Sequence, residues 1–190
     1  IITARGNNGT IRMWDIRTQR IAGEWYIGGN QAATALAVSP TDSDFCVAGF
    51  LNGRIVTIDL RCSMNSGPTN IDAPKANEKI LRIVGNSSKP TSFIAGTAKG
   101  SCMRWETLNN SEIIYEGRQP LADIDVHLTN PLAVLSPVNA PPFITNTNMT
   151  KLHTLKNVDH GSICSFHPVL PVIAFASPSG EILQYELTSR

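Results

Sequence analysis

The chain has 190 residues, of which 42% are hydrophobic and 16% are charged, and its formal net charge is +1 at pH 7. This length and apolar content suffice for a sizeable core, and the low charged fraction excludes a disordered chain and a coiled coil. A net charge near zero gives no general attraction to nucleic acid or to an anionic membrane surface. No apolar run approaches the roughly 18 residues of a membrane-spanning helix, so direct membrane insertion is not expected.

A glycine turn followed by a short strand recurs along the chain. In each full copy a large residue stands five positions after the glycine, and an acid follows it directly. The four copies, each given as glycine, large residue and acid, are Gly9, Trp14 and Asp15; Gly53, Ile58 and Asp59; Gly100, Trp105 and Glu106; and Gly180, Tyr185 and Glu186. A degenerate copy between the last two has Asn139 and Ile144 at these positions. A period in the low forties with a terminal Trp-Asp is typical of a four-stranded propeller blade.

Residues 1–27 predict three strands, and residues 32–72 predict four. In the first segment the strands are Ile1–Ala4, Thr10–Ile16 and Arg20–Ile27, with a tight turn at Asn7-Asn8-Gly9. In the second segment they are Ala33–Val38, Phe45–Phe50, Arg54–Leu60 and a short outer strand near Thr69–Asp72, within the irregular connection Ser63–Asn77. Pro40 ends the inner strand of the second segment, because proline cannot continue a central strand.

The remaining three segments, 79–118, 121–156 and 161–187, repeat this plan less regularly. Their predicted strands are Ile80–Val84, Ser92–Thr97, Cys102–Thr107 and Glu112–Glu116; then Leu121–His127, Leu132–Leu135 and Phe143–Thr145; then Ser162–Phe166, Val172–Ala176 and Glu181–Leu187. Pro141 and Pro142 donate no ladder hydrogen bonds, so the strand at Phe143–Thr145 is expected to be short or bulged. The last segment lacks an outer strand.

We therefore predict an all-β fold over residues 1–190, with about four to five four-stranded blades of a propeller. A seven-bladed ring needs about 300 residues, so two to three further blades are expected upstream of Ile1, and the chain is expected to be the C-terminal part of a propeller. The flat side chains of Trp14 and Trp105 are expected to be buried between adjacent blades.

The sequence contains no recognisable catalytic or cofactor-binding pattern. Its histidines (His127, His153, His160 and His167) lack metal-ligand spacing, and its cysteines (Cys46, Cys62, Cys102 and Cys164) lie far apart. Buried, reduced thiols are favoured over disulfides. Asp123 and Asp125 share a strand face but have no evident acid or base partner. We predict that the chain is not an enzyme and uses no cofactor, metal or small-molecule substrate.

Two Asp-x-Arg pairs stand at the ends of equivalent strands: Asp15 with Arg17, and Asp59 with Arg61. In each pair both side chains project from the same face. The structural interpretation is an aspartate that accepts hydrogen bonds from turn amides and an arginine that covers the strand end. The functional interpretation is a charged pair presented to a partner protein, since arginine is favoured at interface anchors.

The Gly9–Asp15 segment, the glycine turns and the period resemble the WD40-repeat family over the whole chain. This resemblance implies a WD40-type β-propeller, partial here, and a role as a platform for binding other proteins. Four glycines and three large residues mark the repeats in this comparison: Gly9, Gly53, Gly100, Gly180, Trp14, Trp105 and Tyr185.

A narrower resemblance is to the C-terminal propeller of the raptor family, the regulatory subunits of TOR kinase complex 1. It is carried by Ile11–Arg17, Val47–Gly49, Gly53–Arg61, Leu121–His127, the Trp-less Val138–Asn148, Phe166–Pro168, Pro171 and Gln184–Leu187. The resemblance implies a non-catalytic scaffold that binds TOR complex subunits, helps recruit substrates and positions the kinase. It also implies a cytoplasmic protein that partners recruit to lysosomal or vacuolar membranes. Thr57-Ile58 and the Ser63–Asn77 insert depart from the pattern.

A second family also matches part of the chain. In WD-repeat substrate receptors of cullin–RING ubiquitin ligases, a Trp-Asp-x-Arg box binds the adaptor subunit. Trp14-Asp15-Ile16-Arg17 fits this box, and Ile58-Asp59-Leu60-Arg61 is a near match. This resemblance implies a ligase receptor as the alternative function.

Overall fold

The computed structural model describes residues 1–5, 9–27, 31–41, 44–61, 69–71, 77–85, 92–107 and 110–187. Within these ranges the protein is all-β, without a helix, as predicted. Asn7-Asn8, Cys62 and Ser63–Pro68, on which parts of the prediction fell, lie outside the described residues. Among the residues described, no helix has the length and apolarity needed to cross a bilayer.

The strands form five antiparallel sheets, each built from consecutive strands in chain order. The first sheet contains β1 (Ile2–Arg5), β2 (Thr10–Asp15) and β3 (Arg20–Tyr26); the second contains β4 (Ala33–Val38), β5 (Phe45–Phe50), β6 (Ile55–Asp59) and β7 (Thr69–Ile71). The third contains β8 (Ile80–Gly85), β9 (Phe93–Thr97), β10 (Ser101–Thr107) and β11 (Asn110–Glu116). The fourth contains β12 (Leu121–Val126), β13 (Leu132–Pro137), β14 (Phe143–Asn146) and β15 (Lys151–Thr154); the fifth contains β16 (Ile163–Phe166), β17 (Val172–Ala176) and β18 (Ile182–Glu186).

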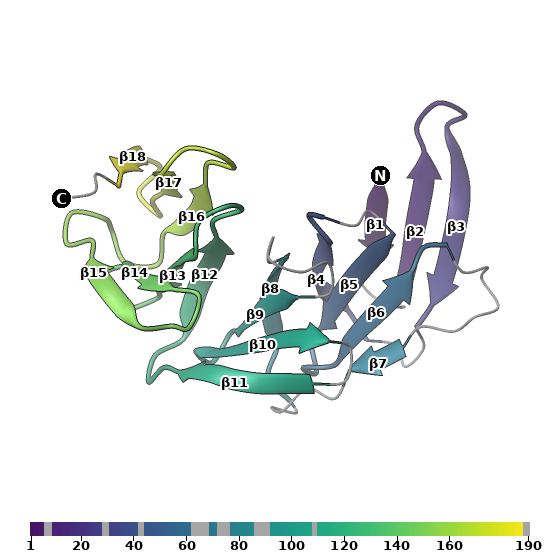
Figure 1. The fold of residues 1–190 in the computed structure, drawn as a ribbon, viewed down its shortest axis with the longest axis horizontal. Helices are drawn as coiled ribbons and strands as arrows, with labels where there is room; N and C mark the ends of the chain where they lie inside the picture. Colours follow the sequence, from purple (N-terminus) through teal and green to yellow (C-terminus); the bar gives the residue numbers. More distant parts are fainter. Residues whose placement is uncertain are drawn as a thin grey trace.

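The five sheets follow one another along an arc, with the first and fifth sheets on opposite arms (Figure 1). The first strands of neighbouring sheets contact each other, β4 with β8, β8 with β12, and β12 with β16. These inner strands therefore line the inside of the arc, and the later strands of each sheet lie outward. This is the arrangement of a partial β-propeller, which the repeat period predicted.

A hydrophobic cluster fills each of the four spaces between neighbouring sheets. Ile11 and Trp25 meet Cys46 and Phe50 between the first and second sheets. The three clusters that follow have these members at their centres: Val47, Ile80, Phe93 and Trp105; then Ile94, Leu121, Ile124 and Phe143; then Val134, Leu155, Phe166 and Ile173. The core is thus divided into layers between sheets, and each sheet depends on its neighbours for burial.

The two repeat tryptophans differ in burial. Trp105 is 1% exposed and stacks on Phe93, with ring centroids 5.7 Å apart, in the cluster facing the second sheet. Trp14 is only partly buried, and its indole N–H donates to Thr3 at 2.9 Å. The expectation that Trp14 lies buried between blades is therefore wrong for the described structure. Trp105 faces the preceding sheet, and no described sheet precedes the one that carries Trp14.

The fourth sheet also departs from the predicted frame. In the repeat, Ile144 is equivalent to Trp105, which faces the preceding sheet. Ile144 instead faces the following, fifth sheet, in the cluster with Phe166. Its neighbour Phe143 faces the third sheet instead. The strand is short, and its pairing with β15 is irregular between Ile144 and Thr145, as the two preceding prolines predicted. Phe143 and Ile144 thus point to the opposite neighbours from those that the repeat spacing predicts.

The glycine turns have the backbone conformation that their residue type predicts. The φ angles of the four repeat glycines are positive: 61° for Gly9, 84° for Gly53, 108° for Gly100 and 91° for Gly180. Gly100 has a second constraint, because a Cβ atom there would lie 2.2 Å from the carbonyl oxygen of Gln119. Glycine is required at this position both for the turn and for the close approach of the chain that leads to the fourth sheet.

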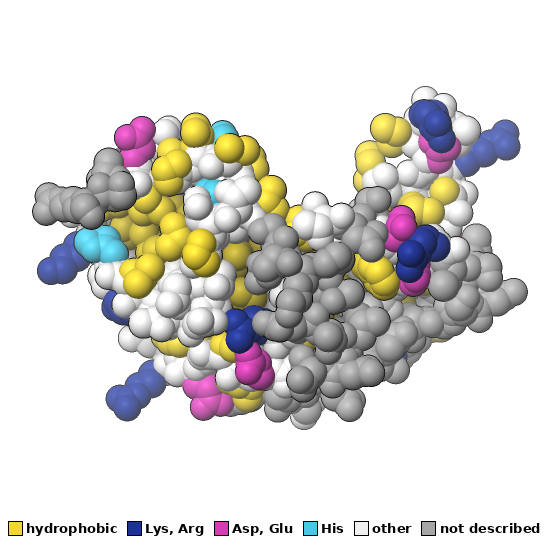
Figure 2. All heavy atoms as spheres, viewed as in Figure 1, with side chains coloured by type: hydrophobic (Ala, Val, Ile, Leu, Met, Phe, Trp, Pro, Cys, Tyr) yellow, Lys and Arg dark blue, Asp and Glu magenta, His cyan; other side chains and the backbone are white. Residues whose placement is uncertain are grey.

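The fifth sheet buries one face and exposes the other. Cys164 and Phe166 pack against the fourth sheet, whereas Ile163 and Ile182 are 60% and 81% exposed. Figure 2 shows hydrophobic side chains gathered over the arm that contains this sheet. The outward face of β16–β18 therefore carries exposed isoleucines and alanines beside Ser165, Gln184 and Glu186, and no other described element covers it.

Candidate functional site

The first Asp-x-Arg pair closes the turn after β2. The carboxylate of Asp15 accepts the backbone N–H of Arg17 at 2.9 Å and contacts its guanidinium Nε at 3.4 Å. The backbone hydrogen bond from Arg17, followed by that from its side chain, lowers the pKa of Asp15. The Arg17 side chain is 88% exposed, so most of its guanidinium faces solvent.

The second pair has the same geometry with shorter distances. Asp59 accepts the backbone N–H and the Nε–H of Arg61, each at 3.0 Å, and the Nη2–H at 2.8 Å. The guanidinium also lies 5.4 Å from the ring centroid of Phe45 and 3.7 Å from a carboxylate oxygen of Asp44. Arg61 is therefore held more firmly than Arg17, although its side chain is still 58% exposed.

Both interpretations of these pairs thus describe part of the geometry. The aspartates accept turn amides, which is the structural role, and the arginines remain largely exposed at equivalent corners of adjacent sheets. A partner with a carboxylate could approach either guanidinium, because both arginine side chains are more than half exposed. Partner binding at Asp15, Arg17, Asp59 and Arg61 stays a prediction.

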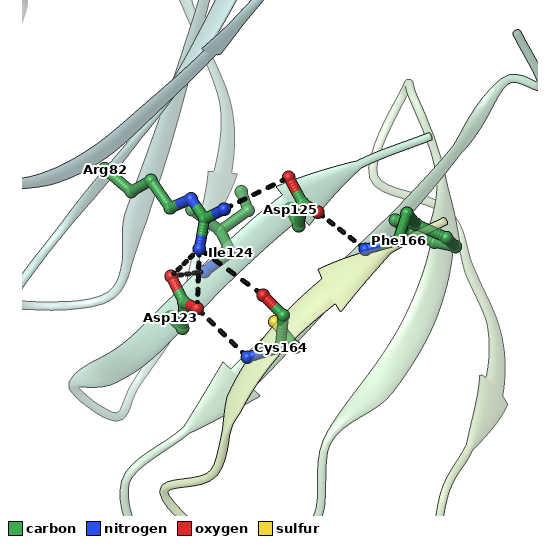
Figure 3. Close-up of polar contacts among 6 residues, drawn as sticks. All are labelled: Arg82, Asp123, Ile124, Asp125, Cys164 and Phe166. Carbon is green, nitrogen blue, oxygen red and sulfur yellow. Dashed lines mark hydrogen bonds and ion pairs between the residues drawn. The ribbon is translucent and has the colours of Figure 1, made fainter. Parts of the chain in front are cut away.

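A larger ionic cluster lies on the inner strands, where sequence reasoning did not place one. Arg82 on β8 donates through Nη1 to both carboxylate oxygens of Asp123 on β12, at 2.8 and 3.1 Å, and to the Cys164 carbonyl of β16 at 3.3 Å. Its Nη2 atom lies 3.6 Å from Asp125. Figure 3 shows this arginine reaching from the third sheet to the fourth and fifth. One side chain therefore links three successive sheets.

The two aspartates bond in turn to the free edge of β16. Asp123 accepts the backbone N–H of Cys164 at 3.0 Å, and Asp125 accepts that of Phe166 at 2.7 Å (Figure 3). Side chains two residues apart on one strand lie on the same face. The two amides that they meet are also two residues apart, so both point from the same edge of β16. The carboxylates thereby satisfy edge donors that would otherwise be buried without partners.

Arg82, Asp123 and Asp125 are called the Arg82 cluster below. Burial and the neighbouring charges have opposite effects on the pKa values of Arg82 and Asp125. Burial raises the pKa of Asp125 above its ordinary value of 3.8, against the lowering effects of the Phe166 amide and Arg82. For Arg82, burial lowers the pKa, but the two aspartate charges offset this and leave the value raised. The guanidinium therefore stays charged and compensates the two carboxylates.

The sequence held a partial signal for the Arg82 cluster. Asp123 and Asp125 stand on a strand that reads as inner, where acids are rarely buried unless they are paired. Their partner Arg82 is 41 residues before Asp123, on another sheet, so spacing alone does not reveal the contact. The ion pair between these aspartates and Arg82 was therefore not predicted from the sequence.

A groove of about 400 Å³ runs between the inner strands β4 and β8, and Arg82 and Asp125 line it. Thr34 on β4 donates to the Ile80 carbonyl of β8 at 2.6 Å, which closes part of the adjacent strand edge. Among the described residues, no group of three histidines, cysteines or acids is placed to hold a metal ion. The polar groups of this groove thus serve mainly to join sheets.

Two of the histidines accept hydrogen bonds at the ends of inner strands. The Nδ1 atom of His127 accepts the amides of Thr129 and Asn130 at 3.2 and 3.1 Å, and His167 makes the same pair of bonds to Val169 and Leu170 at 3.1 and 2.9 Å. With Nδ1 occupied as an acceptor in both, each histidine closes a turn. His167 therefore follows β16 directly, and β16 ends at Phe166 as the predicted strand Ser162–Phe166 does.

The three cysteines in the described residues, Cys46, Cys102 and Cys164, are buried free thiols, as predicted. Burial raises the pKa of Cys46 and Cys102 to about 12 and that of Cys164 well above its usual value. A nucleophilic thiol requires a lowered pKa and access to solvent. These cysteines therefore contribute to packing and have no features of a reactive site.

Comparison with known proteins supports the fold. The solved structure of Raptor from Chaetomium thermophilum superposes with a TM-score of 0.80 and 16% sequence identity, over 97% of this chain and 18% of that protein. The β-propeller domain of Cps50 (Swd1) from Myceliophteria thermophila superposes with a TM-score of 0.79 and 11% identity, over 98% of this chain and 62% of that one. No family model and no curated protein matches the sequence.

These similarities establish that the chain forms part of a WD40-type β-propeller. At identities of 16% and 11% they concern the fold alone, and the two superpositions are nearly equal in quality. The chain spans about a fifth of the length of the Raptor structure that it matches. Function must therefore be argued from the sequence resemblance and from the exposed surfaces.

Proposed function

We propose that the chain is a non-catalytic interaction scaffold and that it forms part of a raptor-like subunit of TOR kinase complex 1. In this role it would bind other subunits, help recruit substrates and position the kinase. The observation that supports the proposal is the coincidence of two comparisons. The segments Ile11–Arg17 and Gly53–Arg61 resemble the raptor family in sequence, and the structure superposes on Raptor over 97% of the chain.

The geometry favours binding over catalysis. The clustered titratable groups on the inner strands, Arg82, Asp123 and Asp125, are engaged with one another and with the edge of β16. A general base or nucleophile would need an accessible group with a tuned pKa next to a substrate-sized cavity. The exposed arginines at the ends of β2 and β6 are instead suited to contacts with another protein.

The test is affinity purification of the full-length protein, tagged at its native locus, followed by immunoblotting for the TOR kinase. We expect the kinase to co-purify. We also expect the full-length protein to contain a helical-repeat region before residue 1. A purified complex without the kinase, or a complete sequence that begins one or two blades upstream, would contradict the proposal. An identically tagged, unrelated WD40 protein from the same cells controls for background.

The alternative function is a substrate receptor of a cullin–RING ubiquitin ligase. It is favoured by the same hydrogen-bond pattern in the two Asp-x-Arg pairs on adjacent sheets and by arginines that are both more than half exposed. The same purification distinguishes this function, because it would recover the ligase adaptor. The double variant Arg17→Ala, Arg61→Ala should then lose the adaptor, and Arg20→Ala should retain it, since Arg20 is an exposed arginine of the same hairpin outside both pairs. Retention by the double variant would exclude this mode of binding.

A further inference from the structure

A second groove, of about 320 Å³, lies between the third and fourth sheets, away from the Arg82 cluster. One side is formed by the end of β11 and the turn that follows it, and the other by the β13–β14 turn and β15. It combines residues from two sheets and contains no residue of the two Asp-x-Arg pairs. We call it the β11–β15 groove.

The floor of the β11–β15 groove is apolar and aromatic. The rings of Tyr115 and Phe143 lie with centroids 6.1 Å apart at an angle of 53°, and Pro137 and Pro141 extend the apolar lining. The side formed by the turn after β11 is fixed by a hydrogen bond from the Gly117 amide to the Gly100 carbonyl at 2.9 Å. Tyr115 and Pro141 are partly exposed, and these rigid side chains lose little conformational entropy when a ligand covers them.

The charge at the edge of this groove is mainly positive. Arg118 lies in the turn of the third sheet and Lys151 at the start of β15, and both side chains are exposed. The Lys151 ammonium lies 4.8 Å from the ring centroid of Phe143, so the cation stands directly over the apolar floor. The structure gives neither cation an ion pair within the described chain. Glu116 is the acid among the lining residues, and it has an interaction partner of its own.

We propose that the β11–β15 groove binds an extended segment of a partner protein in which an apolar side chain lies next to an aspartate or glutamate. The apolar side chain would pack on Tyr115 and Pro141, which are partly exposed, and would cover the edge of Phe143, which is 7% exposed. The neighbouring carboxylate would pair with Arg118 or Lys151, which approach from different sheets. Lys151 lies over the Phe143 ring and Arg118 lines the other side of the groove, so a partner with an acid close to an apolar residue would contact both the cations and the apolar lining. The proposal does not depend on which complex contains the chain.

The experiment uses a library of random peptides displayed on phage, selected on the immobilised full-length protein. Selected peptides are synthesised with a fluorescent label, and their affinity is measured by anisotropy. We expect the enriched peptides to pair Asp or Glu with Leu, Ile, Phe, Tyr or Trp. We also expect the double variant Arg118→Glu, Lys151→Glu to bind them at least about tenfold more weakly, because the edge of the groove would then repel the carboxylate.

The matched control is Lys156→Glu, which makes the same change of charge at an exposed lysine outside the groove lining and should leave affinity unchanged. Replacing the peptide acid by lysine should restore binding to the double variant. Circular dichroism establishes that each variant retains its sheets. Failure to enrich any peptide, enrichment of peptides without acids, or equal binding to the double variant would overturn the proposal. Self-association of the wild type that the double variant loses would assign the groove to a second copy of the chain, and would likewise overturn it.

Discussion

The carboxylate of Asp125 on β12 accepts the backbone N–H of Phe166 on β16 at 2.7 Å, across the boundary between two sheets. Asp123 does the same for Cys164, and Arg82 holds Asp123 from the third sheet. The inner strands of the protein are therefore joined by side chains where a single continuous sheet would use backbone pairing. The stability of the protein should therefore depend on Arg82 and Asp125.

Replacing Arg82 by methionine should lower the free energy of unfolding by about 2–3 kcal/mol. The change leaves the Asp123 carboxylate, whose side chain is 7% exposed, without its cation. Loss of a partner from a fully buried pair costs about 3–5 kcal/mol, and the 35% exposure of Arg82 reduces that figure. Urea unfolding measures the effect. Arg12→Met is the control, because Arg12 is 30% exposed but its partner Glu24 is 39% exposed, so a loss below about 1 kcal/mol is expected. Equal losses in the two variants would contradict the prediction.

Asp125 should make a contribution to stability that decreases as pH rises. Its pKa in the folded state is raised by burial above the ordinary 3.8, so the folded protein holds this proton more tightly than the unfolded chain does. The resulting stabilisation is complete below pH 3.8 and is lost as pH rises through the folded-state pKa. The variant Asp125→Asn lacks this pH-dependent contribution, because asparagine does not titrate. Its amide oxygen can still accept a hydrogen bond from the backbone N–H of Phe166. Unfolding free energy should therefore rise more steeply with pH in the variant than in the wild type above pH 3.8, and a shallower rise would refute the assignment.

The three described cysteines should resist alkylation in the folded protein. Burial raises the pKa of Cys46 and Cys102 to about 12, so almost no thiolate forms near pH 8, and Cys164 is buried as well. Iodoacetamide labelling followed by peptide mass spectrometry should detect modification at these positions only after unfolding in urea. Rapid native labelling of any of the three would show that its sheet boundary opens readily.

The two repeat tryptophans should differ in their effect on stability. Trp105→Ala removes a ring that is 1% exposed and stacked on Phe93, and should cost about 3–5 kcal/mol. Trp14→Ala should cost about 1–2 kcal/mol, because that ring is only partly buried and its hydrogen bond to Thr3 is exposed. Urea midpoints of the two variants, compared with the wild type, test the difference. A Trp14 variant as unstable as the Trp105 variant would indicate that another element covers Trp14.

Two glycine turns offer a matched pair of substitutions. Gly180→Ala should cost about 1–2 kcal/mol, since φ is 91° but a Cβ atom meets no other atom within 4 Å. Gly100→Ala should cost clearly more, because φ is 108° and the added Cβ would lie 2.2 Å from the Gln119 carbonyl oxygen. Thermal denaturation of both variants measures the contribution of the close contact alone. Similar melting temperatures would mean that the chain around Gln119 moves aside without cost.

Much of the fold could be predicted from the sequence because its local signals agree. Glycine turns, a regular spacing and prolines after inner strands each mark the same strand ends, for example at Gly53 and Pro40. The partial exposure of Trp14 could not be predicted, because it depends on whether a sheet stands beside that ring. The direction of Ile144 could not be predicted, because the fourth segment lacks the glycine turn that marks the other repeats. The contact between Arg82 and Asp123 was missed because it joins residues 41 positions apart on different sheets. The exposed Asp-x-Arg pairs were found, because a two-residue spacing on a strand fixes their common face.

The reach of the two aspartates also has a consequence for the curvature of the molecule. A carboxylate extends a fixed and short distance from its backbone, so the bonds from Asp123 and Asp125 hold β16 at one separation and one angle from β12. A glutamate at either position would push the strands apart and straighten the arc. The curvature at this boundary therefore depends on the length of two side chains as well as on the hydrophobic cluster beside them.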